Sequence, residues 1–98
     1  MDLVALYAQP DDPAAFDKAY FETHVPLIRQ VPGLEDIQVK RIQRTLMGDG
    51  CYMLAVMQFR DEESLKTAMR SPEMQAAGDN LNGFAEGLVT LMYAVDAD

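Results

Sequence analysis

Two apolar runs, residues 51–59 and 88–95, most constrain what this chain can fold into. Each is short and strongly apolar, which is typical of a β-strand in the body of a sheet. Alternate residues of a strand point to opposite faces of the sheet. In the first run one face carries Cys51, Met53, Ala55, Met57 and Phe59, and the other carries Tyr52, Leu54 and Val56. Leu88, Met92 and Ala94 likewise oppose Val89, Leu91, Tyr93 and Val95, so both faces of the sheet must be covered.

The remaining chain supplies two more strands and two helical regions. Asp12 followed by Pro13, and Ser71 followed by Pro72, are typical helix starts. We expect strands over residues 3–8, 35–46, 51–59 and 88–95, with a bulge between Val39 and Ile42. Helices are expected over residues 13–24 and 26–30, from 61, and from 72, and a loop over 78–87. This order predicts an α+β fold, a ferredoxin-like βαββαβ protomer with an antiparallel four-stranded sheet.

The helices of such a protomer cover only one face of its sheet. The 98 residues are enough for one domain, expected over 1–98, and 49% of them are apolar. A small domain cannot bury that much apolar surface alone. We therefore expect a homodimer in which two sheets face each other as a dimeric α+β barrel.

Charge and composition exclude several classes of function. The formal net charge of −8 argues against binding to nucleic acid or to an anionic membrane. No apolar run approaches the roughly 18–20 residues that span a bilayer, and no signal peptide is evident. A single cysteine, Cys51, excludes an intrachain disulfide and favours a reducing, cytoplasmic location. One histidine and one cysteine form no metal-ligand cluster, and with no glycine-rich phosphate loop we expect no metal and no cofactor.

The only histidine, His24, is the candidate catalytic residue. Phe16, Tyr20 and His24 recur every fourth residue, so they share one face of the expected helix. Pro26 should interrupt that helix and open a gap for a small molecule beside His24. His24 would then act as a general acid or base, and Tyr20 would donate a hydrogen bond to a substrate oxygen. Alternatively, His24 only hydrogen-bonds the backbone and Tyr20 only packs in the core.

Four further residues are expected to line the substrate site: Phe16, Pro26, Asp79 and Phe84. Phe16 could equally be a core residue. Asp79 could orient His24 or cap a loop. Met53, Met57 and Met92 could line an adaptable pocket or simply pack in the core or the dimer interface.

Several segments resemble the EthD family. They are residues 9–16, 20–27 and 31–34, then Phe59, 64–65, 69–73, 75–77, Asp79 and Phe84. The resemblance implies a ferredoxin-like protomer in a dimeric barrel. The family is named for a component of an ether-degrading oxidation system and is similar to cofactor-independent isomerases, polyketide cyclases and monooxygenases. In muconolactone isomerases a histidine matching His24 takes part, but their second histidine has no counterpart here. Haem-degrading relatives use a tryptophan, which this chain lacks.

Three classes of function remain open on the sequence. The first is a small enzyme that acts on a hydrophobic, oxygen-bearing molecule, in oxidative catabolism or by cofactor-free acid–base chemistry. The second is a non-catalytic module that binds or shields such a ligand for a partner oxidase. The third is a dimer with no small-molecule role. A deep cavity beside His24 would favour the first two.

Overall fold

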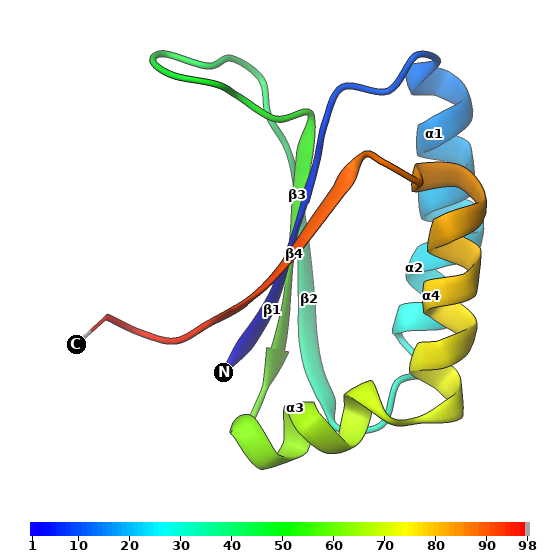
Figure 1. The fold of residues 1–98 in the computed structure, drawn as a ribbon, viewed down its shortest axis with the longest axis vertical. Helices are drawn as coiled ribbons and strands as arrows, with labels where there is room; N and C mark the ends of the chain where they lie inside the picture. Colours follow the sequence, from blue (N-terminus) through cyan, green and yellow to red (C-terminus); the bar gives the residue numbers. More distant parts are fainter. Residues whose placement is uncertain (98) are drawn as a thin grey trace.

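The computed structural model describes residues 1–97 and contains one four-stranded sheet (Figure 1). Its strands are β1 (Asp2–Tyr7), β2 (Leu34–Arg41), β3 (Met53–Phe59) and β4 (Val89–Ala94). They lie in the order β2-β3-β1-β4, and every neighbouring pair is antiparallel. Ala5 at the middle of β1 lies opposite Ala55 of β3 and Leu91 of β4. The predicted ferredoxin-like α+β fold is confirmed.

The helices lie on one side of this sheet. The first helical region runs without interruption through α1 (Pro13–Ala19), a π-helical turn η1 (Tyr20–His24) and α2 (Val25–Ile28). The second consists of α3 (Glu62–Met69) and α4 (Pro72–Ala85). Asp12, Asp61 and Ser71 cap α1, α3 and α4 by accepting backbone N–H groups at 3.1, 2.8 and 3.1 Å. In Figure 1, α1, α2 and α4 lie along one face of the sheet, and α3 lies at one end.

The core fills the space between that face and the helices. Its strand residues alternate in sequence, as the pleat requires: Leu3, Ala5, Tyr7, Ile37, Met53, Ala55, Met57 and Phe59 are all buried. The opposite face carries Val4, Leu6, Leu54, Val56 and Met92, which are partly or largely exposed. Within residues 1–97, no helix covers this open face (Figure 1).

The prediction of a loop over residues 78–87 is wrong for residues 78–85, which are helical. Residues 72–85 form the single 14-residue helix α4. Glycine at positions 78 and 83 suggested a loop, because each costs about 1 kcal/mol in a helix relative to alanine. Ala77, Leu81 and Ala85 fall four residues apart and are all buried against the core. Their packing outweighs the glycine cost.

Pro26 does not interrupt the helix as expected. It lies in the first turn of α2, which continues directly from η1, so its missing N–H removes one backbone hydrogen bond without ending the helix. Val25 before it keeps helical angles, with φ −59° and ψ −44°. The irregularity lies upstream, in η1, where the N–H of Val25 bonds the carbonyl oxygen of Tyr20 five residues earlier.

The middle strands are shorter than expected, and the bulge lies elsewhere. β2 ends at Arg41 and β3 begins at Met53, and the register shift falls between Leu34 and Asp36. Residues 42–52 instead form a projecting arm, closed at its base by the Ile42 N–H bonding the carbonyl of Tyr52 at 3.0 Å. The arm extends away from the helices, as does the end of the chain after β4 (Figure 1). None of the helices in residues 1–97 is long and apolar enough to cross a bilayer.

Candidate functional site

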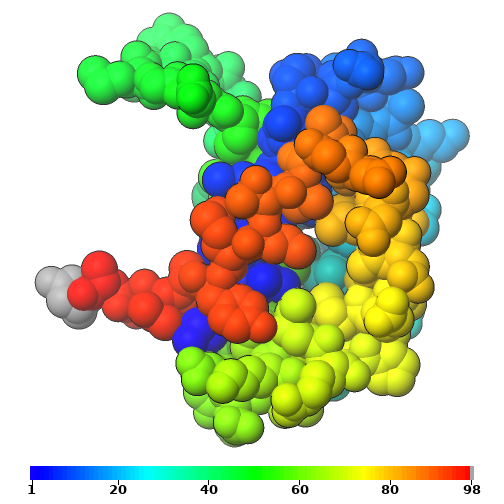
Figure 2. Space-filling model, in the orientation of Figure 1, coloured from blue at the N-terminus to red at the C-terminus, as the bar shows by residue number. Residues whose placement is uncertain are grey.

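A cavity of about 250 Å³ lies between the sheet and α4. Its walls are mainly apolar, with Leu3 of β1, Met57 of β3, and Met69 and Met74 around the bend from α3 to α4. Leu91 of β4 borders it and is 48% exposed. The space-filling view is hollowed between β4 (orange) and α4 (yellow), which is where the cavity opens (Figure 2).

His24 is the buried polar residue that lines this cavity. Its side chain is 4% exposed and comes from the last position of η1. π-Helical turns insert an extra residue into a helix and are frequent at functional sites. Nδ1 of His24 lies 3.1 Å from Oδ1 of Asn80 on α4. An amide oxygen only accepts hydrogen bonds, so Nδ1 carries the hydrogen and Nε2 keeps its lone pair.

Burial controls the charge of this imidazole. It lowers the pKa of His24 below its usual value of 6.5, while the hydrogen bond to Asn80 opposes the shift. Burial disfavours the charged form because the cavity walls cannot solvate it. At neutral pH His24 is therefore an uncharged group able to accept a proton.

Two neighbouring phenols extend the polar part of the site. Tyr7 lines the cavity beside His24, and its ring lies 5.3 Å from that of Tyr20. Burial raises the pKa of both phenols; the neighbouring Tyr20 raises that of Tyr7 further. The pKa of Tyr20 is raised to about 12, with the interaction with Tyr7 opposing the shift. Both hydroxyls stay protonated at neutral pH and can donate hydrogen bonds.

The structure places Tyr20 behind the cavity. Its ring lies 5.5 Å from that of His24, and the residue is 1% exposed. Tyr7 is the phenol at the cavity wall, and it is not among the site residues predicted from the sequence. Tyr7 follows Leu3 and Ala5 at every second position of the strand. This alternation in the sequence indicates that Tyr7 lies on the buried face of β1.

Phe16 and Phe84 support His24 from the other side. The Phe16 ring stacks on Tyr20 at 6.0 Å, and the Phe84 ring lies 5.7 Å from His24 and 5.4 Å from Phe16. These aromatic contacts fix the imidazole in place. Both phenylalanines also border a second hollow near the start of α1.

Asp79 and Pro26 occupy different positions from those the sequence suggested. Asp79 borders the cavity and accepts a hydrogen bond from Gln75 Nε2 at 3.0 Å within α4. The partner of His24 is the next residue, Asn80, which is not among the predicted site residues because a loop was expected there. Pro26 is exposed on α2.

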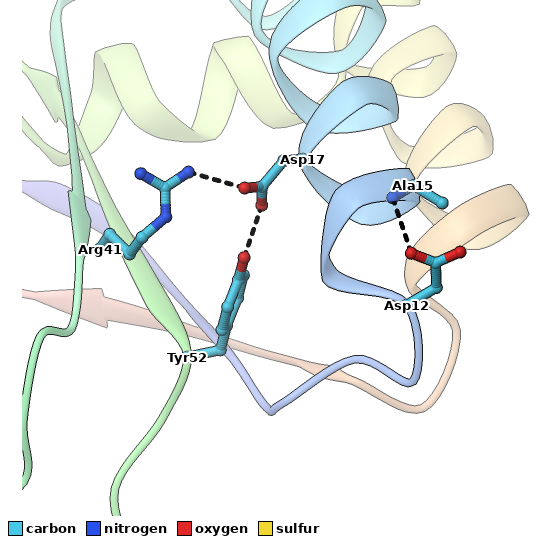
Figure 3. A network of polar contacts seen from close by, with 5 residues as sticks. All are labelled: Asp12, Ala15, Asp17, Arg41 and Tyr52. Carbon is cyan, nitrogen blue, oxygen red and sulfur yellow. Dashed lines mark hydrogen bonds and ion pairs between the residues drawn. The ribbon is translucent and has the colours of Figure 1, made fainter.

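A second polar cluster lies at the base of the arm (Figure 3). Asp17 of α1 accepts hydrogen bonds from Arg41 Nη2 and from the Tyr52 hydroxyl, each at 2.8 Å. The Arg41 guanidinium also lies 5.8 Å from the ring centre of Phe21. This cluster joins the helical layer to both legs of the arm. In residues 1–97, no three His, Cys, Asp or Glu side chains are grouped as metal ligands.

Comparison with known proteins identifies the family. The EthD domain model matches residues 8–87. The chain belongs to the EthD family. One relative is an EthD family protein from Bacillus halodurans C-125, whose description names ethyl tert-butyl ether. Its crystal structure is known, and its sequence is 46% identical to this chain. It superposes with a TM-score of 0.92 over 97% of this chain and 96% of that one.

A second relative is the uncharacterized 11.0 kDa protein of the thcB–thcC intergenic region of Rhodococcus erythropolis. It is 36% identical over 90 residues, which cover 90% of this chain and 86% of that protein. The EthD match includes His24, Tyr20 and Asn80, whereas Tyr7 and Leu91 lie just outside it.

Two distant structures share the EthD fold. One is a dimeric protein of unknown function and ferredoxin-like fold from Bacteroides fragilis, 18% identical, with a TM-score of 0.65 over 96% of this chain and 94% of that one. The other is SnoaB, a cofactor-independent oxygenase from Streptomyces nogalater, which is 14% identical. Its TM-score is 0.62 over 98% of this chain and 92% of that one.

Proposed function

We propose that this EthD protein binds a small hydrophobic molecule bearing an oxygen atom and transfers a proton to or from it through His24. The observation that carries the proposal is a neutral, buried imidazole, hydrogen-bonded at Nδ1, at the wall of an apolar cavity. At about 250 Å³ the cavity is slightly smaller than the roughly 300–1,000 Å³ of most ligand sites, which suits a ligand of about one ring.

Each group then has a defined role. His24 takes a proton from the bound ligand through Nε2, which its bond to Asn80 leaves unprotonated. Negative charge develops on the ligand oxygen, and the Tyr7 hydroxyl stabilises that oxygen by donating a hydrogen bond. Tyr20 assists by packing its ring against the rings of both Tyr7 and His24 behind the cavity, which holds them in position. A base placed in this way contributes roughly 10²–10⁴-fold to a rate.

The other candidate residues shape the site. Phe16 and Phe84 hold the imidazole ring, and Asp79 borders the cavity. Pro26 lies two residues after His24 in the first turn of α2, and its ring fixes the backbone angle φ where the chain leaves the site. The family description and the fold shared with SnoaB support a place in oxidative catabolism for this chemistry.

We further propose a homodimer formed through the open faces of two sheets. Val4, Leu6, Leu54, Val56 and Met92 present apolar side chains on that face. An exposed apolar area of this kind is typical of a protein interface. The ferredoxin-like protein from Bacteroides fragilis is described as dimeric, which supports a dimer for this fold.

A second candidate function is a module that binds or shields a ligand for a partner oxidase. The apolar cavity and its single imidazole favour it, because binding needs no second proton donor. The two candidates differ in whether His24 is needed for turnover or only for affinity.

The first experiment is native mass spectrometry of freshly isolated protein, which identifies a retained ligand and counts subunits. Hydrophobic cyclic ketones then serve as probes. Deuterium exchange at the carbon next to the carbonyl, followed by NMR, measures proton transfer. We expect exchange to be catalysed by the wild type, lost in His24→Gln, and unchanged in the surface variant Thr67→Ala. Ligand binding without exchange would instead support the binding module, and no binding by any probe would contradict both.

A further inference from the structure

The arm ends in apolar side chains that the described residues leave uncovered. Leu46 is 82% exposed and Met47 is 92% exposed at its tip. The arm extends on the side of the sheet opposite the helices (Figure 1). Two neighbouring large apolar side chains in water, carried on a projecting segment, are typical of a contact with another molecule.

A second hollow, of about 380 Å³, lies at the same end of the sheet. It is placed where the chain passes from β1 to α1 and from α4 to β4. Its apolar part is formed by Phe16, Phe84 and Leu88. Asp11, Asp12 and Glu86, which are exposed, surround it with carboxylates.

We propose that in the dimer the arm tip of each subunit docks into this hollow of the other subunit. The proposal rests on the homodimer proposed above, and sheet order supports it. The arm joins β2 and β3, which form one half of the sheet, whereas the hollow adjoins β1 and β4, the other half. The proposal places the two-fold axis of the dimer parallel to the strands. Such an axis exchanges the halves of the sheet and keeps its ends, so each arm lies over the partner's hollow.

The arm is long enough to reach. Each of its two legs has about five residues, which extend about 16 Å at 3.3 Å per residue. Facing sheets pack about 10 Å apart. The tip therefore extends about 6 Å past the plane of the partner's sheet, toward the hollow on the helix side of that sheet.

One cation of the arm can pair with the hollow. The arm, residues 42–52, carries Arg44 on its first leg and Asp49 on its second. The hollow carries carboxylates from Asp11, Asp12 and Glu86. Arg44, next to the tip, would meet these carboxylates when the tip is seated. Opposite charges across an interface select the partner and its orientation.

Docking would also reach the candidate site. Phe16 and Phe84 form one wall of the hollow and also pack against Tyr20 and His24. Each arm would thus complete the packing behind the histidine of the other subunit. In the dimer, the second copy of the chain would therefore help to hold Phe16 and Phe84 against Tyr20 and His24.

Cysteine cross-linking tests this arrangement in a Cys51→Ala background, which removes the native thiol. Met47→Cys and Ala15→Cys are introduced in separate chains and co-expressed, since Ala15 borders the hollow. Mild oxidation should give a disulfide-linked dimer only when both variants are present. The control pairs Met47→Cys with Thr67→Cys, on α3 at the other end of the sheet. A dimer linked through Met47→Cys alone, or through the control pair, would overturn the proposal.

Charge reversal gives a second measurement on the same contact. Arg44→Glu should raise the dimer dissociation constant at least tenfold, and Glu86→Arg in the same chain should restore most of the affinity. Sedimentation equilibrium of the wild type tests the dimer itself. A wild-type monomer would remove both the dimer and the docking proposal, whereas the exchange assay with His24→Gln tests the chemistry separately. A dimer that neither cross-links between positions 47 and 15 nor responds to Arg44→Glu would overturn the docking alone.

Discussion

Nδ1 of His24 lies 3.1 Å from Oδ1 of Asn80, although 56 positions separate the two residues. The bond joins the π-helical turn η1 to the middle of α4, the two helical elements that flank the cavity. It assigns the hydrogen to one ring nitrogen and leaves the other for a ligand. The chemistry proposed for His24 therefore depends on α4 being a helix at Asn80.

Replacing Asn80 by alanine should lower the pKa of His24 further. The bond to Asn80 is the interaction that raises this pKa against the effect of burial, and the variant removes it. Because His24 is the only histidine, its ring proton signals in an NMR titration are assigned without ambiguity. Thr67→Ala, on α3 outside the cavity, should leave the pKa unchanged. A rise in the pKa in Asn80→Ala would contradict this account.

The wild type should lose stability below about pH 6.5. The unfolded chain binds a proton at His24 near that pH, whereas the folded protein resists protonation to a lower pH because the pKa is depressed. The unfolded state then carries more protons, so the free energy of unfolding falls as the pH falls and levels off below the folded pKa. Urea unfolding between pH 8 and pH 5 measures this. His24→Gln should show a smaller slope, and an equal slope in both proteins would count against a depressed pKa.

Tyr7→Phe should weaken binding of an oxygen-bearing ligand by about 0.5–1.5 kcal/mol, the usual contribution of one hydrogen bond. Tyr7 lines the cavity, and its raised pKa keeps the hydroxyl available as a donor. Calorimetric titration with the ligand found by native mass spectrometry gives the affinity. Tyr52→Phe is the matched control, because its hydroxyl bonds Asp17 at the base of the arm. Equal losses in both variants would rule out a direct role for Tyr7.

Two methionine substitutions should separate the core from the proposed dimer interface. Met57 is 4% exposed and lies on the helix side, so Met57→Asp should cost several kcal/mol of folding free energy, as expected for a buried unpaired charge. Met92 is 40% exposed on the open face, so Met92→Asp should weaken the dimer and leave a folded monomer. Thermal unfolding and sedimentation equilibrium measure the two effects. A dimer of unchanged affinity in Met92→Asp would contradict the open-face interface.

Gly83→Ala should stabilise the protein by about 0.5–1 kcal/mol. Position 83 lies inside α4, and a methyl group there would have no heavy atom within 4 Å outside its own helix and neighbours. Gly87→Ala is the contrasting variant, since Gly87 has a φ of 78° that favours glycine and should lose stability when replaced. Melting temperatures of the two variants should move in opposite directions. A lower melting temperature for Gly83→Ala would show that the helix needs its flexibility.

The elements with clear periodicity were predictable from sequence. Alternation in residues 51–59 indicated a strand with two apolar faces, and the spacing of Phe16, Tyr20 and His24 placed three rings on one side of a helix. The full length of α4 was not predictable in this way. Its two glycines have a low helix propensity, whereas the packing of its buried residues against the core favours a helix. Asn80 was missed with it, since a polar residue in an expected loop carries no local sign of a distant partner.

The π-helical turn has a consequence for the direction of the imidazole. An α-helix winds about 100° per residue, so residues eight apart, such as Phe16 and His24, would diverge by about 80° around its axis. A wider turn winds less per residue and takes up this divergence between Tyr20 and His24. The smaller rotation per residue in these five residues therefore turns the imidazole toward the cavity. Winding these five residues as a regular α-helix, with no residue removed, would rotate His24 by as much as about 80° away from the face that carries Phe16, even with every side chain of the site still present.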